Sequence, residues 1–267
     1  MENSIFTYLS SLCEHDHICH LYYDDSECYE IATNFLIHGI KRNDKCVYIS
    51  DRPAPSDLVT RLKGHGIAEL NNCNEKILEE ILLNNPVRES KKAQAFITNI
   101  ENKIDAVLRK GHKPLRILMI HSDNFYFLTS SERLWKRAYL NKICLEKPII
   151  LMSQFQVDRI SSKDVLSIFK THPTIVERNN VYKSPLYVNP ETILKGFENE
   201  ADKFRALSGK EKKVLGLIIH GLSNSGIAKE LSISVKTVET HRANIMKKLE
   251  IHNLVDLVKF SMRNGIA

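Results

Sequence analysis

Apolar and polar residues follow two different periods along the first 190 residues, and these periods predict alternating helices and strands. Residues 26–40 and 93–109 carry apolar side chains at helical spacing. The apolar runs at 115–123 and 148–155 are nearly continuous, as in strands that are buried on both faces. This alternation predicts an α/β domain built on a parallel sheet.

Shorter signals complete the pattern. The remaining predicted elements are strands at 18–22 and 45–50 and helices at 56–64 and 131–145. Ser56 and Asp57 are candidate caps of the helix that starts there. Residues 174–188 alternate around Asn179-Asn180, which predicts a hairpin, and Pro185 places its second half at a sheet edge. The polar stretch 71–90 gives no clear period.

The last third of the chain contains only helical patterns. Pro190 starts an amphipathic helix, and four short helices are predicted after it. Ser208 and Glu211 have the spacing of a capping box, and Gly221 ends the same helix. We therefore expect three parts: an α/β domain over 1–189, a linker helix over 190–204 and a small all-α domain over 205–267.

The charge is concentrated in this small domain. The chain has 267 residues and a net charge of +6. Residues 205–267 hold eleven Lys and Arg against five Asp and Glu, so they carry the whole excess, and the preceding residues hold 27 of each sign. A basic module beside a neutral domain predicts a polyanion partner for the module alone.

Other compositional features restrict the class of protein. No apolar run reaches 18 residues, and the N-terminus lacks a basic segment followed by an apolar one, so we expect a cytoplasmic protein. The six cysteines include no CxxC pair and are expected to be reduced thiols.

Two short helices joined by a tight turn, the second polar and basic on one side, meet the requirements for reading a DNA major groove. The second of these helices is predicted after Ser234, with Val238, Ile245 and Leu249 on its apolar side. Double-stranded DNA is therefore the expected partner. The residues expected to contact it are Ser223, Asn224, Lys236, Thr237, Glu239, Thr240, Arg242, Ala243 and Lys247.

This segment resembles the LuxR-type helix-turn-helix, through motifs such as "GLSN", "TVETHR" and "NIM" at the family's spacing. The resemblance implies that Glu239, Thr240 and Ala243 face bases, and that the last helix mediates dimerisation on DNA. Ser225-Gly226 departs from the family pattern, and Gly226 would loosen its helix because glycine has low helix propensity. His241 is expected to be a packed histidine.

Several interpretations compete for the first domain. Its element order resembles the RecA/KaiC type of P-loop domain, but the chain has no GxxxxGK[ST] motif, and the first turn carries Asp24, Asp25 and Glu27 where glycines would stand. We therefore expect this parallel sheet without ATP hydrolysis. A phosphoacceptor receiver domain is disfavoured because Asp51 follows the second strand, not the third.

A metal or haem site is the next alternative, since Cys13, His15, His17, Cys19, His20 and Cys28 lie close together in the sequence. Alternation along a strand at 18–22 places His17 and Cys19 on one face and His20 on the other. A site with four converging ligands would therefore need further ligands from residues outside this strand. Ordinary buried thiols remain the competing interpretation, and we expect no metal and no certain cofactor.

The runs "DHICHLYYDDSE", "FLIHGIKRNDKCVYIS" and "HPTIVERNNVYKSPLYV" resemble the MEDS domain, named for methanogens, methylotrophs and the DcmR regulator. This resemblance covers roughly residues 10–190 and implies a ligand-responsive input domain without established catalysis. The chain departs from it at Ser153-Gln154-Phe155.

In open α/β sheets, ligands bind beyond the carboxyl ends of the strands. The candidate effector contacts are His17, His20, Tyr22, Tyr23, Asp24, Ser50, Asp51, His121, Asp123 and Gln154. We thus expect a one-component, homodimeric transcription regulator, not an enzyme, that senses a small molecule. An ATP-binding signalling protein and a redox or metal sensor with the same DNA-binding module stay open as alternatives.

Overall fold

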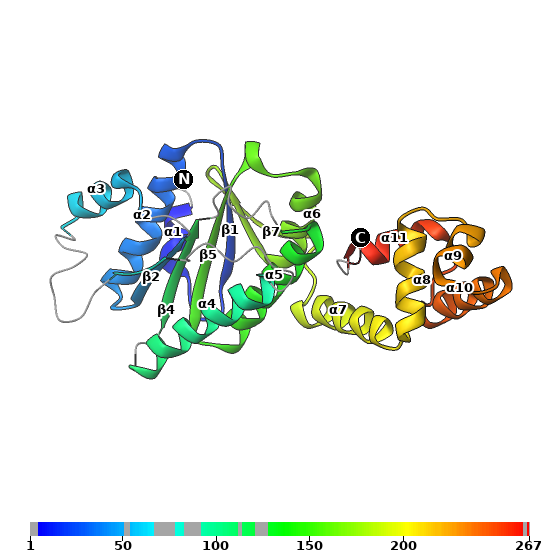
Figure 1. Ribbon diagram of the computed structural model, residues 1–267. Coiled ribbons are helices and arrows are strands. Elements are labelled where there is room, and N and C mark those ends of the chain that lie inside the picture. The colour runs from blue at the N-terminus through cyan, green and yellow to red at the C-terminus, as the bar shows by residue number, and fades with distance from the viewer. Residues whose placement is uncertain are drawn as a thin grey trace. The chain divides into compact units, whose positions relative to one another are not determined.

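The computed structural model describes residues 5–50, 54–66, 78–82, 92–111, 114–120, 128–263 and 266. The chain folds into two compact units, Met1–Glu191 and Thr192–Ala267 (Figure 1). The first unit is α/β and the second is helical, as expected. Among the described residues, no helix is both long enough and apolar enough to cross a membrane.

The first unit contains one sheet whose strands lie in the order β3-β2-β4-β5-β1-β6-β7. Their bounds are β1 His17–Tyr22, β2 Lys45–Ser50, β3 Leu78–Leu82, β4 Leu115–Ile120, β5 Ile149–Gln156, β6 Thr174–Glu177 and β7 Asn180–Lys183. Every neighbouring pair is parallel except β6 and β7, which form the hairpin predicted around Asn179-Asn180, with β7 at the sheet edge. Strand β3 lies within the polar stretch 71–90, where the sequence shows neither a helical nor a strand period.

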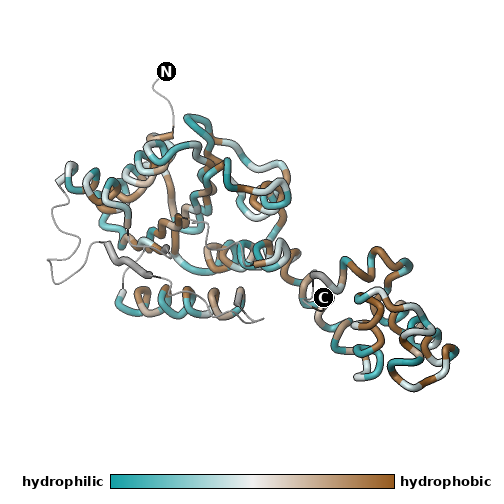
Figure 2. Tube along the Cα trace, turned by 45° about the horizontal axis from the view of Figure 1, so that its top comes forward, coloured by the Kyte–Doolittle hydropathy of each residue, from teal (hydrophilic) through white to brown (hydrophobic). Residues whose placement is uncertain are grey.

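Helices cover both faces of this sheet. Their bounds are α1 Ile5–Ser11, α2 Asp25–Lys41, α3 Ser56–Gly64, α4 Lys92–Arg109, α5 Ser130–Glu146 and α6 Ser162–Thr171. Residues of α1, α2 and α3 share one apolar core with the sheet, whereas α4 and α5 share another. A smaller cluster packs α6 on β1, β5 and β6. Most strand segments are apolar in Figure 2, as burial between two helical layers requires.

The strand order creates a topological switch point between β1 and β5. The chain leaves β1 through α2 towards β2 and β3, but leaves β5 through a 3-10 turn, Val157–Arg159, and α6 towards β6. The two connections run in opposite directions across the sheet. The carboxyl ends of β1 and β5 are therefore where a doubly wound sheet binds ligands.

Two local predictions differ from the structure. Ser56 is the first residue of α3 and does not cap it; Pro55 stands at the N-cap position, and no side chain caps this helix. A proline fixes φ near the value a helix start requires, which explains the entry of the chain without a polar cap. Helices α1 and α6 were not predicted, and both are short, with 7 and 10 residues.

Below α2, a buried ion pair fixes the helix to the sheet. Arg116 of β4 and Asp44, just before β2, are almost completely buried. Arg116 Nε donates to Asp44 Oδ2 at 2.9 Å, and Nη1 donates to the carbonyl of Phe35 at 3.3 Å. The guanidinium also lies 4.9 Å from the centre of the Phe35 ring. The side chain passes so close to α2 that only glycine fits at position 39.

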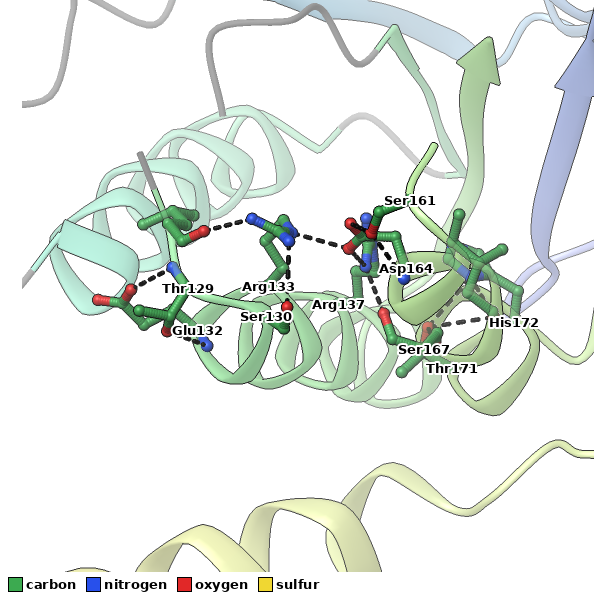
Figure 3. A network of polar contacts seen from close by, with 12 residues as sticks. Thr129, Ser130, Glu132, Arg133, Arg137, Ser161, Asp164, Ser167, Thr171 and His172 are labelled. Atoms are coloured by element: carbon green, nitrogen blue, oxygen red, sulfur yellow. Dashed lines mark hydrogen bonds and ion pairs between the residues drawn. The ribbon is translucent and has the colours of Figure 1, made fainter. Parts of the chain in front are cut away.

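Helices α5 and α6 are joined by a second polar network (Figure 3). Arg133 Nε and Arg137 Nη1 both donate to Asp164 Oδ1, at 2.7 and 3.0 Å, and Ser161 donates to Oδ2 at 2.6 Å. Arg137 also donates to Ser167. Burial opposes ionisation of Asp164, but these donors outweigh it and lower its pKa to about 2. The carboxylate therefore stays ionised and bridges the two helices.

The second unit is a bundle of helices around one apolar core. Their bounds are α7 Pro190–Arg205, α8 Gly209–Ile219, α9 Asn224–Leu231, α10 Val235–Leu249 and α11 Leu254–Arg263. The prediction for α7 left open what it packs on. Its last turn contacts this bundle, because Phe204 packs on the core and Lys203 lies 2.5 Å from the Glu250 carboxylate.

The ion pair below α2 yields a prediction. A Cβ on Gly39 would lie 2.5 Å from both Cδ and Nε of Arg116. We expect Gly39→Ala to lower the free energy of unfolding of the first unit by about 1–3 kcal/mol, since overpacking displaces a buried side chain. Urea unfolding followed by fluorescence of Trp135, the sole tryptophan, measures this.

Gly64→Ala, at the end of α3, is the matched control because nothing lies within 4 Å of its Cβ position. An equal loss of stability in both variants would contradict the steric explanation.

Candidate nucleic-acid interface and effector site

Polar caps fix the two helices of the helix-turn-helix and the turn between them. Ser223 caps α9 by accepting from the amide of Gly226 at 3.2 Å, and Ser234 caps α10 by accepting from the amide of Thr237 at 3.0 Å. Between the helices, Ser232 adopts a left-handed conformation with φ of 52°, and the amide of Ile233 donates to the carbonyl of Ala228 at 3.0 Å. Helix α9 runs without a break through Gly226.

Helix α10 presents a polar side to the solvent. Val238, Ile245 and Leu249 are buried in the core of the second unit. The residues exposed on the other side are Lys236, Glu239, Thr240, Ala243 and Lys247, with Thr237, His241 and Arg242 half-buried. From Lys236 to Lys247 the helix rises by about 16 Å, which is close to half a turn of B-DNA.

Each group on this side has a distinct capacity. Thr240 Oγ1 donates to the carbonyl of Lys236 at 3.0 Å, so its proton is used and its methyl group and lone pairs remain for a base edge. The Glu239 carboxylate can accept from the amino group of cytosine. Ala243 adds no bulk that would hold the helix away from the bases. The first amides of α10 attract phosphate oxygens.

A buried glutamate braces this helix against α8. Glu211 Oε2 accepts from the amide of Ser208 at 2.7 Å and from Lys248 Nζ at 2.7 Å. Hydrogen bonding from Lys248 is the main reason that the pKa of Glu211 is lowered. The capping box was evident from the sequence, but the bond to Lys248 was missed, because no local spacing relates residues 37 positions apart.

In the first unit, the structure brings His20 and Gln154 together. They face each other in the register of β1 and β5, and Gln154 Nε2 lies 2.8 Å from His20 Nδ1. The same amide group donates to the carbonyl of Cys28 at 3.0 Å. His20 Nε2 points towards Glu27 in the first turn of α2, 3.9 Å from Oε1. These groups lie at the switch point of the sheet.

Tyr22, Tyr23 and Asp24 lie at the same edge but mainly have structural partners. Tyr22 is buried, and burial raises the pKa of its hydroxyl. Tyr23 donates its hydroxyl proton to Glu177. Asp24 caps α2 by accepting from the amide of Glu27 at 2.9 Å.

His17 lies on the opposite face of β1, away from His20. Its Nδ1 is 3.0 Å from Asn141 Oδ1 on α5, and its ring is tilted by 47° against that of His172, with 4.3 Å between the ring centres. Burial lowers the pKa of His17 to about 4. The remaining candidates, namely the side chain of Ser50 and residues Asp51, His121 and Asp123, lie outside the described part of the chain.

The cysteines and histidines near the N-terminus do not converge. In the part of the chain that the structure describes, no group of three or more His, Cys, Asp and Glu is placed to hold a metal ion. Cys19 and Cys28 are buried, and burial raises the pKa of both thiols. These thiols are thus protonated and not poised for redox chemistry.

Comparison with known families completes the description of the two units. Residues 16–173, more than half of the chain, match the family described as "MEthanogen/methylotroph, DcmR Sensory domain", or MEDS. The chain belongs to the MEDS family. Residues 205–261 match "Bacterial regulatory proteins, luxR family". Both predicted resemblances are confirmed.

Individual relatives share only part of the chain. The uncharacterized response regulatory protein YgeK of Escherichia coli (strain K12) is 48% identical over 60 residues, which are 22% of this chain and 41% of that protein. The oxygen regulatory protein NreC of Staphylococcus carnosus (strain TM300) is 35% identical over 97 residues, which are 32% and 45% of the two chains. The MEDS protein therefore spans less than half of the length of these relatives.

A solved structure of the response regulator StyR aligns with 82% of this chain and 98% of its own, at 18% identity and a TM-score of 0.31.

The brace between α8 and α10 yields a prediction. Replacing Glu211 by Gln removes the ion pair with Lys248, so we expect the second unit to lose about 1 kcal/mol of stability at neutral pH. Because the folded pKa of Glu211 is lowered, its stabilisation is present above the unfolded pKa and is lost as pH falls through the folded value. The variant should therefore lose less stability than the wild type on acidification.

Thermal unfolding of the second unit, followed through the NMR signals of Ile245 between pH 7 and pH 3, measures both effects. Glu230→Gln on α9 is the control, since Glu230 is exposed. Identical pH profiles for wild type and Glu211→Gln would rule out the brace.

Proposed function

We propose that this MEDS protein is a one-component regulator in which a small molecule bound by the first unit controls DNA binding by the second. The observation that carries the proposal is the exposed side of α10, which is polar and basic and belongs to residues 205–267, the segment that carries the whole excess of positive charge. The MEDS family description supports the sensory part.

In this proposal, α10 lies in the major groove. Glu239, Thr240 and Ala243 contact base edges, because they occupy the middle of the exposed side. The proposed phosphate contacts lie at the start of α9, near both ends of α10 and, for Arg242, at the middle of α10; they are Ser223, Asn224, Lys236, Thr237, Arg242 and Lys247.

A second copy of the chain is the proposed partner on DNA, and α11 is the proposed contact. Leu257 and Phe260 of α11 are buried in the bundle, whereas Leu254 and Val255 are 50% and 62% exposed. Two large apolar side chains on one turn of a short helix are a candidate isologous contact, in which the same surface is used by both copies.

The effector is proposed to bind at the carboxyl ends of β1 and β5, where His20 and Gln154 lie. The acidic turn before α2 disfavours nucleotide chemistry at this place. Asp24 is engaged as a cap and Glu27 accepts from the amide of Tyr23 at 3.0 Å, so both carboxylates remain where a triphosphate would have to sit.

DNA binding is tested through the two outer lysines of α10. We expect Lys236→Ala and Lys247→Ala each to weaken binding to every duplex, and to reduce the slope of log affinity against log salt by about 0.9, the value for one phosphate contact. Fluorescence anisotropy with labelled duplexes at several salt concentrations measures both quantities.

Lys195→Ala on α7 is the matched control, since this lysine is exposed but lies outside the helix-turn-helix. If the Lys236 and Lys247 variants behaved like the Lys195 variant, α10 would not be the DNA contact.

The dimer is tested on a duplex selected in vitro for binding. We expect the double variant Leu254→Gln, Val255→Thr to bind this duplex as one chain at concentrations where the wild type binds as two, because the apolar contact is lost. Sedimentation velocity gives the stoichiometry. Leu166→Gln on α6, where the leucine is 55% exposed, is the control. Two variant chains per duplex with unchanged affinity would contradict the role of α11.

A further inference from the structure

His20 and Glu27 leave a hydrogen-bond donor and an acceptor unpaired beside each other. His20 Nε2 and Glu27 Oε1 are both shielded from solvent, and neither has a hydrogen-bond partner among the described residues. The two atoms are 3.9 Å apart, which is too far for a direct hydrogen bond. Buried polar atoms without partners are uncommon, and each calls for an explanation.

The neighbours of His20 determine which of its nitrogens carries the proton. The carbonyl of Cys28 can only accept, so the amide nitrogen of Gln154, 3.0 Å away, must face it. The thiol of Cys28 donates to Gln154 Oε1 at 3.4 Å, which agrees with this orientation. The same amide nitrogen therefore donates to His20 Nδ1 at 2.8 Å. In the neutral imidazole the proton is then on Nε2, and Nε2–H points towards Glu27.

Imidazole and carboxylate are both held in place. His20 is completely buried, and burial lowers its pKa against the opposing effect of Glu27, which favours the neutral ring. Glu27 Oε2 accepts from the amide of Tyr23 at 3.0 Å, and the amide of Glu27 is bound by the Asp24 cap at 2.9 Å. These bonds hold the carboxylate in the first turn of α2, where Oε1 faces His20.

One type of ligand atom satisfies both groups. It must accept from Nε2–H and donate to Oε1, and a hydroxyl oxygen does both from a position about 2.8 Å from each atom. A carbonyl oxygen only accepts and leaves Glu27 unpaired. An ammonium group only donates and leaves His20 unpaired. An anion is repelled by Glu27, Asp24 and Asp25, which surround this turn.

We propose that His20 and Glu27 bind the hydroxyl group of a small, uncharged effector, with Gln154 holding His20 in the tautomer that can donate to it. This inference rests on the proposed function, since it names the chemical class of the effector for the same edge of the sheet. Tyr22 offers an apolar surface for the rest of the molecule, because its buried ring lies 6.0 Å from the His20 ring.

The tautomer is tested without any variant. Nitrogen-15 NMR of the full chain labelled at histidine should show His20 protonated at Nε2 and not at Nδ1 at neutral pH. Titration with propan-2-ol should then shift the Nε2 resonance of His20 saturably. Acetone and isopropylammonium have the same shape but lack one of the two hydrogen-bonding functions, so neither should produce this shift.

Variants assign the binding to the two residues. Glu27→Leu removes the acceptor and should weaken propan-2-ol binding about ten-fold or more, as expected for a lost hydrogen bond to a charged group. Gln154→Met removes the bond to Nδ1 and should leave His20 as a mixture of tautomers. Glu30→Leu is the matched control on the same helix, because Glu30 is exposed. Circular dichroism confirms that each variant is folded.

The inference is overturned if His20 is protonated at Nδ1, if acetone shifts His20 as strongly as propan-2-ol, or if no probe shifts it. Measuring DNA affinity in the same samples distinguishes failure of the hydroxyl site from failure of the proposed control of DNA binding. An effector response that survives Glu27→Leu overturns the hydroxyl site alone. Saturable binding of propan-2-ol that leaves DNA affinity unchanged supports the site and contradicts the proposed control of DNA binding.

Discussion

The parallel pairing of β1 with β5 is the contact on which the first unit depends. Six residues of each strand are in register, from His17 opposite Leu151 to Tyr22 opposite Gln156, although more than 130 positions separate them in the chain. Because both strands are buried on two faces, this ladder joins the apolar core under α1–α3 to the core under α4 and α5. It also creates the switch point and places Gln154 beside His20.

Two buried arginines of the first unit have carboxylate partners. Arg116 is paired with Asp44, and Arg137 with Asp164, so that buried charges are neutralised locally. His17 is neutral and bonded to Asn141. His17 Nε2 and Arg137 Nε are also buried without a hydrogen-bond partner among the residues that the structure describes, whereas His20 Nε2 and Glu27 Oε1 lie unpaired only 3.9 Å from each other.

The second unit depends on polar caps at the ends of its short helices. Its core is small, and its helices are short, so their ends need polar caps to satisfy free amides. Ser208, Ser223 and Ser234 supply these caps in turn, and Glu211 uses one carboxylate to cap α8 and to bind Lys248. With the helix ends capped in this way, Lys236, Glu239, Ala243 and Lys247 of α10 are exposed to solvent.

Sequence alone determined the features that depend on neighbours along the chain. Periodicity gave the α/β and helical parts, the hairpin after Glu177 and the long helices, and the caps at Ser208 and Ser234 were evident from spacing. It also gave the polar, exposed side of α10, because the helical period determines which residues share a side. Only the tertiary structure decided that His20 faces Gln154 while His17 faces Asn141. It also decided that the side chain of Arg116 lies against the backbone of α2 at Gly39. Those contacts join residues far apart in the sequence, and their geometry depends on strand order and register, which no local pattern encodes.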